Sequence, residues 1–503
     1  MTFPFSNECG WPFKRKVERK AVTPPFSNGY RWPLMHDAVT ADDRKELASY
    51  ILSGAKLTQG DTVAQFEKEW SKQYTRGVYE EACERLSTLG GHDSDSIEDF
   101  IWHHRFHEMR PSDETRYYSL FVSSGSTANY LLLAAWKELN EIPDGAGVIV
   151  PACTWMTNVS PIIQNNLRPI FIDIDPHNLG LDLNILRGRI EEVKNHPGYN
   201  LRAVFVTHLL GLGVDMEKLS NIIDDPSIAI FEDSCEAAQL PGIRPPNLNG
   251  HSLGSTFSFY FGHHMTTIEG GMVTTSDSAL YDLMKMKRSH GLSREAYYKQ
   301  PLIDKGLECS PNSFTFATDG YNFRNTNLHA KLGLLQRKRL STNVCHRNWI
   351  FEAFQDIIED YGDHLMTHFS NAGVSSFSLP LIPFSQDRSE VLKSKLDEAG
   401  VEHRPIVGRN LLRHPFLFKS CPKYFLLGKR ENETYVFTDG KISATHEKFA
   451  GLWQPQIWMI VRAKALPVAD ALHDKGLYIG NHEGITPSHL TKILRPILES
   501  TFS

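Results

Sequence analysis

The sequence predicts an α/β protein with a large domain, built on a mostly parallel sheet of seven strands, and a smaller α+β domain after it. The first reason is that short apolar segments alternate with longer helical ones between residues 117 and 275, as in strand–crossover–strand units. The second is that polar clusters follow the ends of several of these strands. The third is length, because 503 residues exceed what a single core usually supports.

The strand–helix alternation places the expected site at one edge of the sheet. The seven expected strands span residues 117–122, 147–150, 169–174, 203–207, 228–232, 255–260 and 272–275. Ligands of such sheets bind beyond the carboxyl ends of the strands. The polar clusters at these ends are residues 123–127, Thr154 with Trp155, His208, Asp233 and His263. We therefore expect the functional site where these side chains meet.

The flanking regions complete the predicted organisation. Residues 1–35, rich in Pro and aromatic residues, are expected to form an N-terminal arm. The large domain is expected to span 36–345 with an insertion at about 76–115, and the small domain 346–503 with an insertion at about 418–452. Helices are expected near 42–52, 62–73 and 325–361, small-domain strands near 376–381, 456–461 and 476–479, and a hairpin around Thr438-Asp439-Gly440-Lys441.

Composition excludes several classes of protein. The chain is 41% hydrophobic and 22% charged, as in ordinary globular proteins. A net charge of -6 gives no electrostatic reason to expect nucleic acid or an anionic membrane as partner. No apolar run approaches the roughly 18 residues of a membrane helix, and the N-terminus has no apolar segment of the signal-peptide type. We expect a cytoplasmic protein.

The metal-ligating residue types are not arranged as a metal site. The seven Cys are scattered singly without a Cys-x-x-Cys pair, which argues against a zinc ribbon or an iron–sulfur cluster. A His-rich run at 102–107 could bind metal. A solvated helix face is the preferred interpretation, because no carboxylate or Cys completes a ligand set at sensible spacing. We expect no metal.

A Ser-Ser-Gly-Ser-Thr segment, residues 123–127, lies between the first strand and a helix. Backbone N–H groups and hydroxyls at the positive end of a helix form an anion site, and phosphate is its commonest occupant. A plain N-cap made by Ser and Thr is the alternative.

Two further strand ends carry residues suited to a flat, cationic ring. Asp233 follows an apolar strand, where a carboxylate needs a cationic partner such as a protonated pyridine nitrogen. Asp233 could instead cap a following helix. Trp155 could stack on a ring or simply fill the core. A phosphate cradle, a ring-nitrogen carboxylate and a stacking aromatic together are the requirements of pyridoxal phosphate.

Several segments in order and spacing resemble the DegT/DnrJ/EryC1/StrS family of fold-type I pyridoxal-phosphate sugar enzymes, which implies an aminotransferase-like fold. The segments are Leu57-Thr58-Gln59-Gly60 with Phe66-Glu67, Ser124-Gly125-Ser126-Thr127-Ala128-Asn129, Pro151-Ala152-Cys153-Thr154-Trp155, Glu232-Asp233-Ser234-Cys235-Glu236-Ala237, Ser258-Phe259-Tyr260, Glu269-Gly270-Gly271, Gly320-Tyr321-Asn322-Phe323-Arg324, Arg404-Pro405 and Gly408-Arg409-Asn410-Leu411-Leu412-Arg413. The resemblance does not extend to the two insertions.

The resemblance implies roles for individual residues. The cofactor-binding set comprises Gly125, Ser126, Thr127 and Ser258 at the phosphate, Trp155 over the ring, Asp233 at the pyridine nitrogen, Glu236 near the ring hydroxyl and Asn322. Asn322 would reach the cofactor phosphate of the neighbouring subunit, so a homodimer with shared active sites is implied. The implied nucleotide-sugar site comprises Thr58, Arg404, Asn410 and Arg413, where Arg suits a pyrophosphate.

The adjacent His263 and His264 follow the strand at 255–260. Two such histidines are compatible with an ordinary loop as well as with chemistry. Family aminotransferases have Lys where this chain has His263, and the same exchange resembles the family's sugar 3-dehydratases. The resemblance therefore implies dehydration of a nucleotide-linked 4-keto-6-deoxy sugar at C3, with pyridoxal or pyridoxamine phosphate as cofactor and His263 as base.

The remaining expectations concern the amino donor and the alternatives. The scattered Cys favour a cluster-free enzyme that is re-aminated by a donor such as glutamate. A divergent aminotransferase without the usual Lys is the second interpretation. A catalytically silent homologue that binds a nucleotide sugar is the third.

Overall fold

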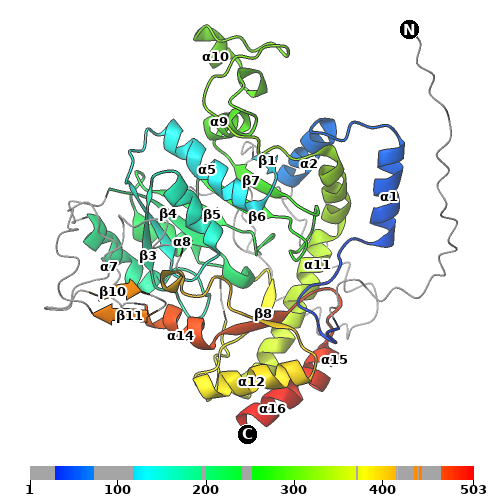
Figure 1. Ribbon diagram of the computed structural model, residues 1–503, viewed down its shortest axis with the longest axis vertical. Coiled ribbons are helices and arrows are strands. Elements are labelled where there is room, and N and C mark those ends of the chain that lie inside the picture. The colour runs from blue at the N-terminus through cyan, green and yellow to red at the C-terminus, as the bar shows by residue number, and fades with distance from the viewer. Residues whose placement is uncertain are drawn as a thin grey trace, which may run out of the picture.

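The computed structural model describes residues 29–72, 117–194, 200–240, 252–369, 372–414, 416, 435–438, 441–444 and 466–503. Its large domain is a seven-stranded sheet with helices on both faces (Figure 1). The strands are β1 (Tyr118–Val122), β2 (Gly147–Pro151), β3 (Arg168–Ile172), β4 (Leu201–Thr207), β5 (Ala229–Asp233), β6 (Gly254–Ser258) and β7 (Gly271–Thr275).

The strand order is β1-β7-β6-β5-β4-β2-β3. β7 runs antiparallel to both of its neighbours, and every other pair in this sheet is parallel. Strands β2, β3 and β7 are buried along their whole length, as expected for a sheet covered on both faces. The predicted mostly parallel seven-stranded sheet is confirmed.

Three apolar clusters of described residues hold helices against the sheet. The large-domain helices are α1 (Ala41–Leu52), α2 (Asp61–Lys72), α5 (Gly125–Leu139), α6 (Ser160–Gln164), α7 (Leu183–Lys194), α8 (Met216–Ile223), α9 (Ser278–Arg288) and α10 (Gln300–Asp304), with short turns η1 (Met156–Asn158), η2 (Leu209–Gly211) and η3 (Ser293–Glu295). α7 and α8 pack on one face in the second cluster, and α5 and α9 share the largest cluster with the small domain. The third cluster joins α2 to β1, β6 and β7. This arrangement leaves the strand ends open to loops.

A buried ion pair ties three of these elements together. Arg288 donates from Nη1 to Glu67 Oε1 at 2.5 Å and to the carbonyl oxygen of Phe121 at 2.8 Å. The same Glu67 oxygen accepts from the Phe121 N–H at 2.9 Å. Both charges are buried and make several hydrogen bonds. Removing either one would leave the other buried without a partner, which would lower the free energy of unfolding by about 3–5 kcal/mol. The pair therefore fixes α2 and α9 on β1.

A 33-residue helix, α11 (Asn327–Glu359), runs through both domains. It passes beside α2 and continues to the small domain (Figure 1). The domain boundary that the sequence places near Cys345 falls inside this helix, so a continuous helix rather than a linker joins the two parts. The domain limits themselves stay a prediction.

The small domain has a three-stranded antiparallel sheet in the order β8-β12-β9. Its elements are β8 (Ser378–Leu381), α12 (Gln386–Glu398), β9 (His403–Pro405), η4 (Leu411–Arg413), α14 (Pro467–Lys475), β12 (Leu477–Gly480), α15 (Pro487–His489), η5 (Leu490–Leu494) and α16 (Arg495–Phe502). Two expected strands correspond to β8 and β12, β9 was not anticipated, and the strand expected at 456–461 lies outside the described residues. β10 (Tyr435–Thr438) and β11 (Lys441–Ala444) pair antiparallel as the expected hairpin.

The last residues of the expected arm pack on the small domain. The buried Trp32 donates from Nε1 to the carbonyl oxygen of Gly480 at 2.9 Å, and the Leu34 N–H donates to Glu402 at 3.0 Å. Residues 1–28, the insertion at 76–115 with its His-rich run, and most of 418–452 lie outside the described residues. Within the described part of the chain, no helix is long and apolar enough to span a membrane.

Candidate functional site

The ends of β1, β5 and β6 meet at Gly125, the first residue of α5. A Cβ placed on Gly125 would lie 2.8 Å from Ser258 Cβ and 2.9 Å from Cys235 Sγ. A Cβ on Gly271 would lie 2.3 Å from the Ser124 carbonyl oxygen. Only glycine allows such close approach. Three segments that are far apart in the sequence therefore form one compact cradle at the predicted edge.

The N-terminus of α5 supports both interpretations of the Ser-Ser-Gly-Ser-Thr segment. Ser124 Oγ accepts from the Thr127 N–H at 3.1 Å, and Thr127 Oγ1 accepts from the Ser124 N–H at 3.0 Å, which is a capping box. Thr127 thus uses its hydroxyl in the cap. The N–H groups of Gly125 and Ser126 have no acceptor within the helix, and Ser126 is exposed. The cap therefore leaves the N–H groups of Gly125 and Ser126 free to bind an anion.

Asp233, at the end of β5, is 3% exposed and held by neutral donors. One carboxylate oxygen accepts from Asn129 Nδ2 at 2.8 Å and the other from the Cys235 N–H at 2.8 Å. The carboxylate forms no ion pair with any side chain in the described ranges. A turn rather than a helix follows it, so the alternative role of helix cap is wrong. A buried carboxylate without a countercharge fits a cation brought by a ligand.

Glu236 lies three residues further on the same turn. Its Oε2 accepts from the Leu210 N–H at 2.7 Å. Burial, with a smaller contribution from Asp233, raises the pKa of Glu236 to about 8. This carboxyl group is therefore protonated at neutral pH and can donate a hydrogen bond to a ligand oxygen.

His263 follows β6 and faces the same turn. Its Nδ1 lies 2.6 Å from the carbonyl oxygen of Cys235. Since a carbonyl only accepts, we assign the proton to Nδ1, which leaves a lone pair on Nε2. The ring packs against Phe377 with 5.2 Å between ring centroids. Burial, with a smaller contribution from Arg347, lowers the pKa of His263 to about 4, so the imidazole is neutral near pH 7.

Trp155 is 56% exposed at the start of η1, so simple core filling is excluded. The loop that carries it is held by the small domain. A Cβ on Gly408 would lie 1.6 Å from the Thr154 carbonyl oxygen, and the Leu411 N–H donates to the Ala152 carbonyl oxygen at 2.9 Å. Stacking of Trp155 on a ring stays a prediction.

The residues expected to bind substrate are spread over both domains. Arg404 pairs with Glu402 at 2.9 Å, and Arg413 pairs with Asp474 at 2.8 Å. Asn410 is 3% exposed, donating to Asp470 at 2.8 Å and accepting from the Leu412 N–H at 3.0 Å. Its amide is thus used within the fold, where it caps η4.

Thr58 and Asn322 are exposed, and within the described part of the chain neither forms a hydrogen bond with the cradle. Asn322 accepts from Arg324 Nε at 3.0 Å.

Tyr478 of β12 pairs in register with Arg404. Burial raises the pKa of Tyr478, and the charge of Glu236 adds to this shift.

Sequence reasoning gave no role to Asn129 or Phe377. Asn129 lies four residues after Gly125, on the same face of α5, so helical spacing could have placed it beside Asp233. Its Oδ1 accepts from the Thr256 hydroxyl, and its Nδ2 also donates to the Thr157 carbonyl oxygen at 3.1 Å. Phe377 comes from the small domain and carried no signal in the sequence.

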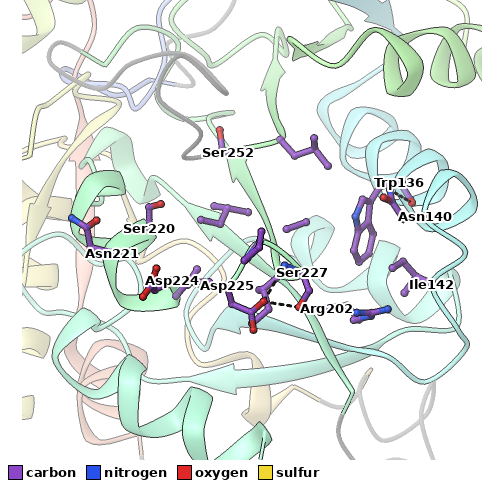
Figure 2. Close-up of a pocket in the computed structure, with 16 residues that line it drawn as sticks. Trp136, Asn140, Ile142, Arg202, Ser220, Asn221, Asp224, Asp225, Ser227 and Ser252 are labelled. Atoms are coloured by element: carbon purple, nitrogen blue, oxygen red, sulfur yellow. Dashed lines mark hydrogen bonds between the residues drawn. The ribbon is translucent and has the colours of Figure 1, made fainter.

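A separate pocket of about 640 Å³ opens at the opposite edge of the sheet (Figure 2). Its walls include Arg202 at the start of β4, Ser252 before β6, and Trp136 with Asn140 at the end of α5. Asp225, which also lines the pocket, accepts from both the N–H and the hydroxyl of Ser227. None of the strand-end residues described above lines this pocket.

The fold and site define an α/β enzyme with a helix N-terminus, a buried carboxylate and a neutral histidine at the carboxyl edge of its sheet. The chain belongs to the DegT/DnrJ/EryC1/StrS aminotransferase family, whose pattern matches residues 115–425.

Similar proteins carry two kinds of activity. A GDP-4-keto-6-deoxy-D-mannose 3-dehydratase from Yersinia pseudotuberculosis is 32% identical over 341 residues, which cover 66% of this chain and 83% of that protein. A GDP-perosamine synthase from Caulobacter vibrioides is 27% identical over 296 residues, which cover 58% of this chain and 71% of that protein. A crystal structure of GDP-4-keto-6-deoxymannose-3-dehydratase with a trapped PLP–glutamate adduct has a TM-score of 0.68 and 24% identity, covering 93% of this chain and 100% of that one.

Proposed function

We propose that this chain is a PLP-dependent dehydratase that replaces the C3 hydroxyl of a nucleotide-linked 4-keto-6-deoxy sugar with hydrogen. The observation that carries the proposal is His263, fixed by Cys235 with Nε2 unprotonated, at the position where family aminotransferases have Lys. The similarity to the Yersinia dehydratase supports the same activity.

The residues present fit the cofactor. The free N–H groups of Gly125 and Ser126 and the Ser258 hydroxyl would hold its phosphate, in the cradle that a Cβ on Gly125 would fill. Asp233, whose partners among the described residues are neutral, would pair with the pyridine nitrogen. When bound, PLP supplies an electron sink and carries the amino group.

The remaining proposed contacts are on the edge of this cradle. The protonated Glu236 would donate to the ring hydroxyl. Trp155 would cover the exposed face of the ring. Each of these assignments rests on the position of the side chain at the strand ends and on the family resemblance.

His263 would perform the proton transfer. Its neutral imidazole accepts a proton at Nε2 and returns it to the oxygen that leaves C3, while Nδ1 stays bonded to Cys235. With imidazole in place of a lysine amine, residue 263 offers no primary amine that could hold the cofactor covalently. We propose that glutamate re-aminates the cofactor after each turnover.

Arg404 and Arg413 would bind the pyrophosphate of the nucleotide, because each guanidinium retains exposed donors beside its ion pair. Thr58 belongs to the same proposed site. Asn410 would contribute by shaping η4, since its own amide is engaged. Asn322 would act on the neighbouring subunit's cofactor, in a homodimer.

Aminotransfer is the second candidate, favoured by the similarity to GDP-perosamine synthase. Mass spectrometry of products formed from nucleotide 4-keto-6-deoxy sugars with PLP and glutamate separates the two. Dehydration gives a sugar lacking one oxygen atom, with 2-oxoglutarate and ammonium released in equal amounts. An amino sugar without ammonium release would contradict the proposal, and failure to bind PLP would favour a silent homologue.

A further inference from the structure

His264, the neighbour of the proposed base, is buried and tied to the small domain. It is 1% exposed, and its Nε2 lies 3.0 Å from the carbonyl oxygen and 3.3 Å from the hydroxyl of Ser375. Because a carbonyl only accepts, Nε2 carries the hydrogen. Nδ1 is buried without a hydrogen-bond partner among the described residues. Burial lowers the pKa of His264 well below its ordinary value, so the ring is neutral.

The segment that His264 binds, residues 375–377, is seated on the large domain by two more bonds. The Ser375 N–H donates to the Gly211 carbonyl oxygen at 2.8 Å, and the Phe377 N–H donates to the Leu210 carbonyl oxygen at 3.0 Å. Gly211 has φ +82°, and a Cβ there would lie 1.8 Å from the Ser375 carbonyl oxygen. The contact is therefore close enough to require glycine.

These contacts form a closed ring around the proposed site. Phe377 packs on His263, and His263 bonds the Cys235 carbonyl oxygen. Glu236 follows Cys235 and accepts from the Leu210 N–H, and Leu210 accepts from the Phe377 N–H. The proposed base and the protonated carboxyl group are thus joined through the same small-domain segment that His264 holds.

Phe377 packs on one side of the His263 ring, and charged or titratable groups are carried by the elements next to it. Arg347 approaches from α11 and donates to the Phe377 carbonyl oxygen at 3.2 Å. Asp233 is the last residue of β5 and Glu236 lies on the turn after it, while Tyr260 and His264 lie on the segment of His263 itself. Desolvation is the largest cause of the lowered pKa of His263, ahead of the Arg347 charge.

We infer that His264 is a positioning residue, which holds the segment of residues 375–377 so that the Phe377 ring stays against the imidazole of His263. The inference rests on the proposed function only in naming His263 as the base. The contacts themselves do not depend on whether the reaction is dehydration or aminotransfer.

The test measures the protonation of His263 directly. NMR titration of cofactor-free protein labelled with ¹³C-histidine follows the ring, whose signal is assigned by its loss in His263→Asn. His264→Gln keeps a side-chain N–H that can donate to Ser375, while His264→Leu keeps bulk without a donor. We expect the His263 pKa to stay near 4 in the wild type and in His264→Gln, and to rise toward its ordinary value of 6.5 in His264→Leu.

Phe377→Ala provides a second variant that does not touch His264. It should raise the His263 pKa in the same direction, because water then reaches the ring. An unchanged pKa in folded His264→Leu, or an equal rise in His264→Gln and His264→Leu, would overturn the inference. Should His264→Leu not fold, an unchanged pKa in Phe377→Ala would overturn it. The product that the wild type forms tests the proposed function separately. Failure of this inference and failure of the proposed function are therefore distinguishable.

Discussion

Individual side chains at the site are held in defined protonation states by burial. His263 and Glu236 are the two groups most affected, since burial lowers the first pKa to about 4 and raises the second to about 8. Both are neutral near pH 7, one as an acceptor and one as a donor. Groups with pKa values moved apart in this way are typical of acid–base sites.

Glu236→Gln should remove a pH dependence of stability. The folded protein keeps the Glu236 proton up to pH about 8, whereas the unfolded chain releases it above about 4.5. The unfolded state therefore binds fewer protons between these values, and this group makes stability fall as pH rises through them. Gln cannot ionise, so the Tm of the variant relative to wild type should increase from pH about 5 to about 8. A constant Tm difference would contradict the raised pKa.

At the scale of elements, the strands follow from their sequence and the site follows from where they end. Buried apolar runs such as those of β2 and β3 predict central strands without reference to any partner. Asp233 and residues 123–127 could be placed at one edge because parallel strands end together. The packing of Phe377 on His263 could not be predicted, because it depends on how the segment just before β8 docks on the large domain.

Polar side chains were harder to interpret than strands. Asn410 was expected to bind substrate, but Asp470 and the Leu412 N–H take up its amide in the structure. Sequence position alone cannot distinguish a turn cap from a ligand contact, because Asn suits both. Thr127 shows the same ambiguity, since its hydroxyl completes the capping box of α5.

Gly125→Ala tests the cradle. The added Cβ would meet Ser258 and Cys235 at under 3 Å, so the β6 end or the turn after β5 must shift. PLP affinity, measured by absorbance titration, should fall by at least tenfold while the protein stays folded. Gly188→Ala on α7 is the control, because nothing lies within 4 Å of its Cβ, and there Ala should stabilise the helix by about 1 kcal/mol. Equal PLP affinity in both variants would contradict the cradle.

Arg413→Ala tests the nucleotide-sugar contact at η4. Loss of the guanidinium should weaken binding of the nucleotide sugar while leaving PLP affinity unchanged, as measured by calorimetry on the holoenzyme. Arg495→Ala is a matched control, because both side chains are 37% exposed and form ion pairs of similar length, to Asp474 and Asp360. An equal effect of the two substitutions on substrate affinity would rule out a specific role for Arg413.

At the scale of the whole molecule, the large domain supplies the cradle and the small domain supplies Phe377 and the two proposed arginines. α11 connects the two domains as one continuous helix (Figure 1). Asn322 is exposed and, among the described residues, forms no hydrogen bond with the cradle of its own subunit, which agrees with the proposed role across a subunit boundary.

Mixing two inactive variants tests the shared site. His263→Asn lacks the base and Asn322→Ala lacks the contact proposed to act on the neighbour. A mixed dimer would contain one site with both residues intact, so activity should reappear after subunit exchange. Sedimentation should show a dimer. If the mixture is no more active than the sum of its parts, although exchange is complete, Asn322 acts within its own subunit.

The central claim is that His263 moves the proton in a dehydration reaction, and His263→Asn measures this most directly. Asn retains polarity and part of the volume but cannot titrate. With PLP binding shown to be intact by absorbance, the rate of C3 deoxygenation should fall by roughly 10²–10⁴-fold, the usual contribution of a general base. Undiminished deoxygenation in His263→Asn would contradict the account and assign the proton transfer to another group.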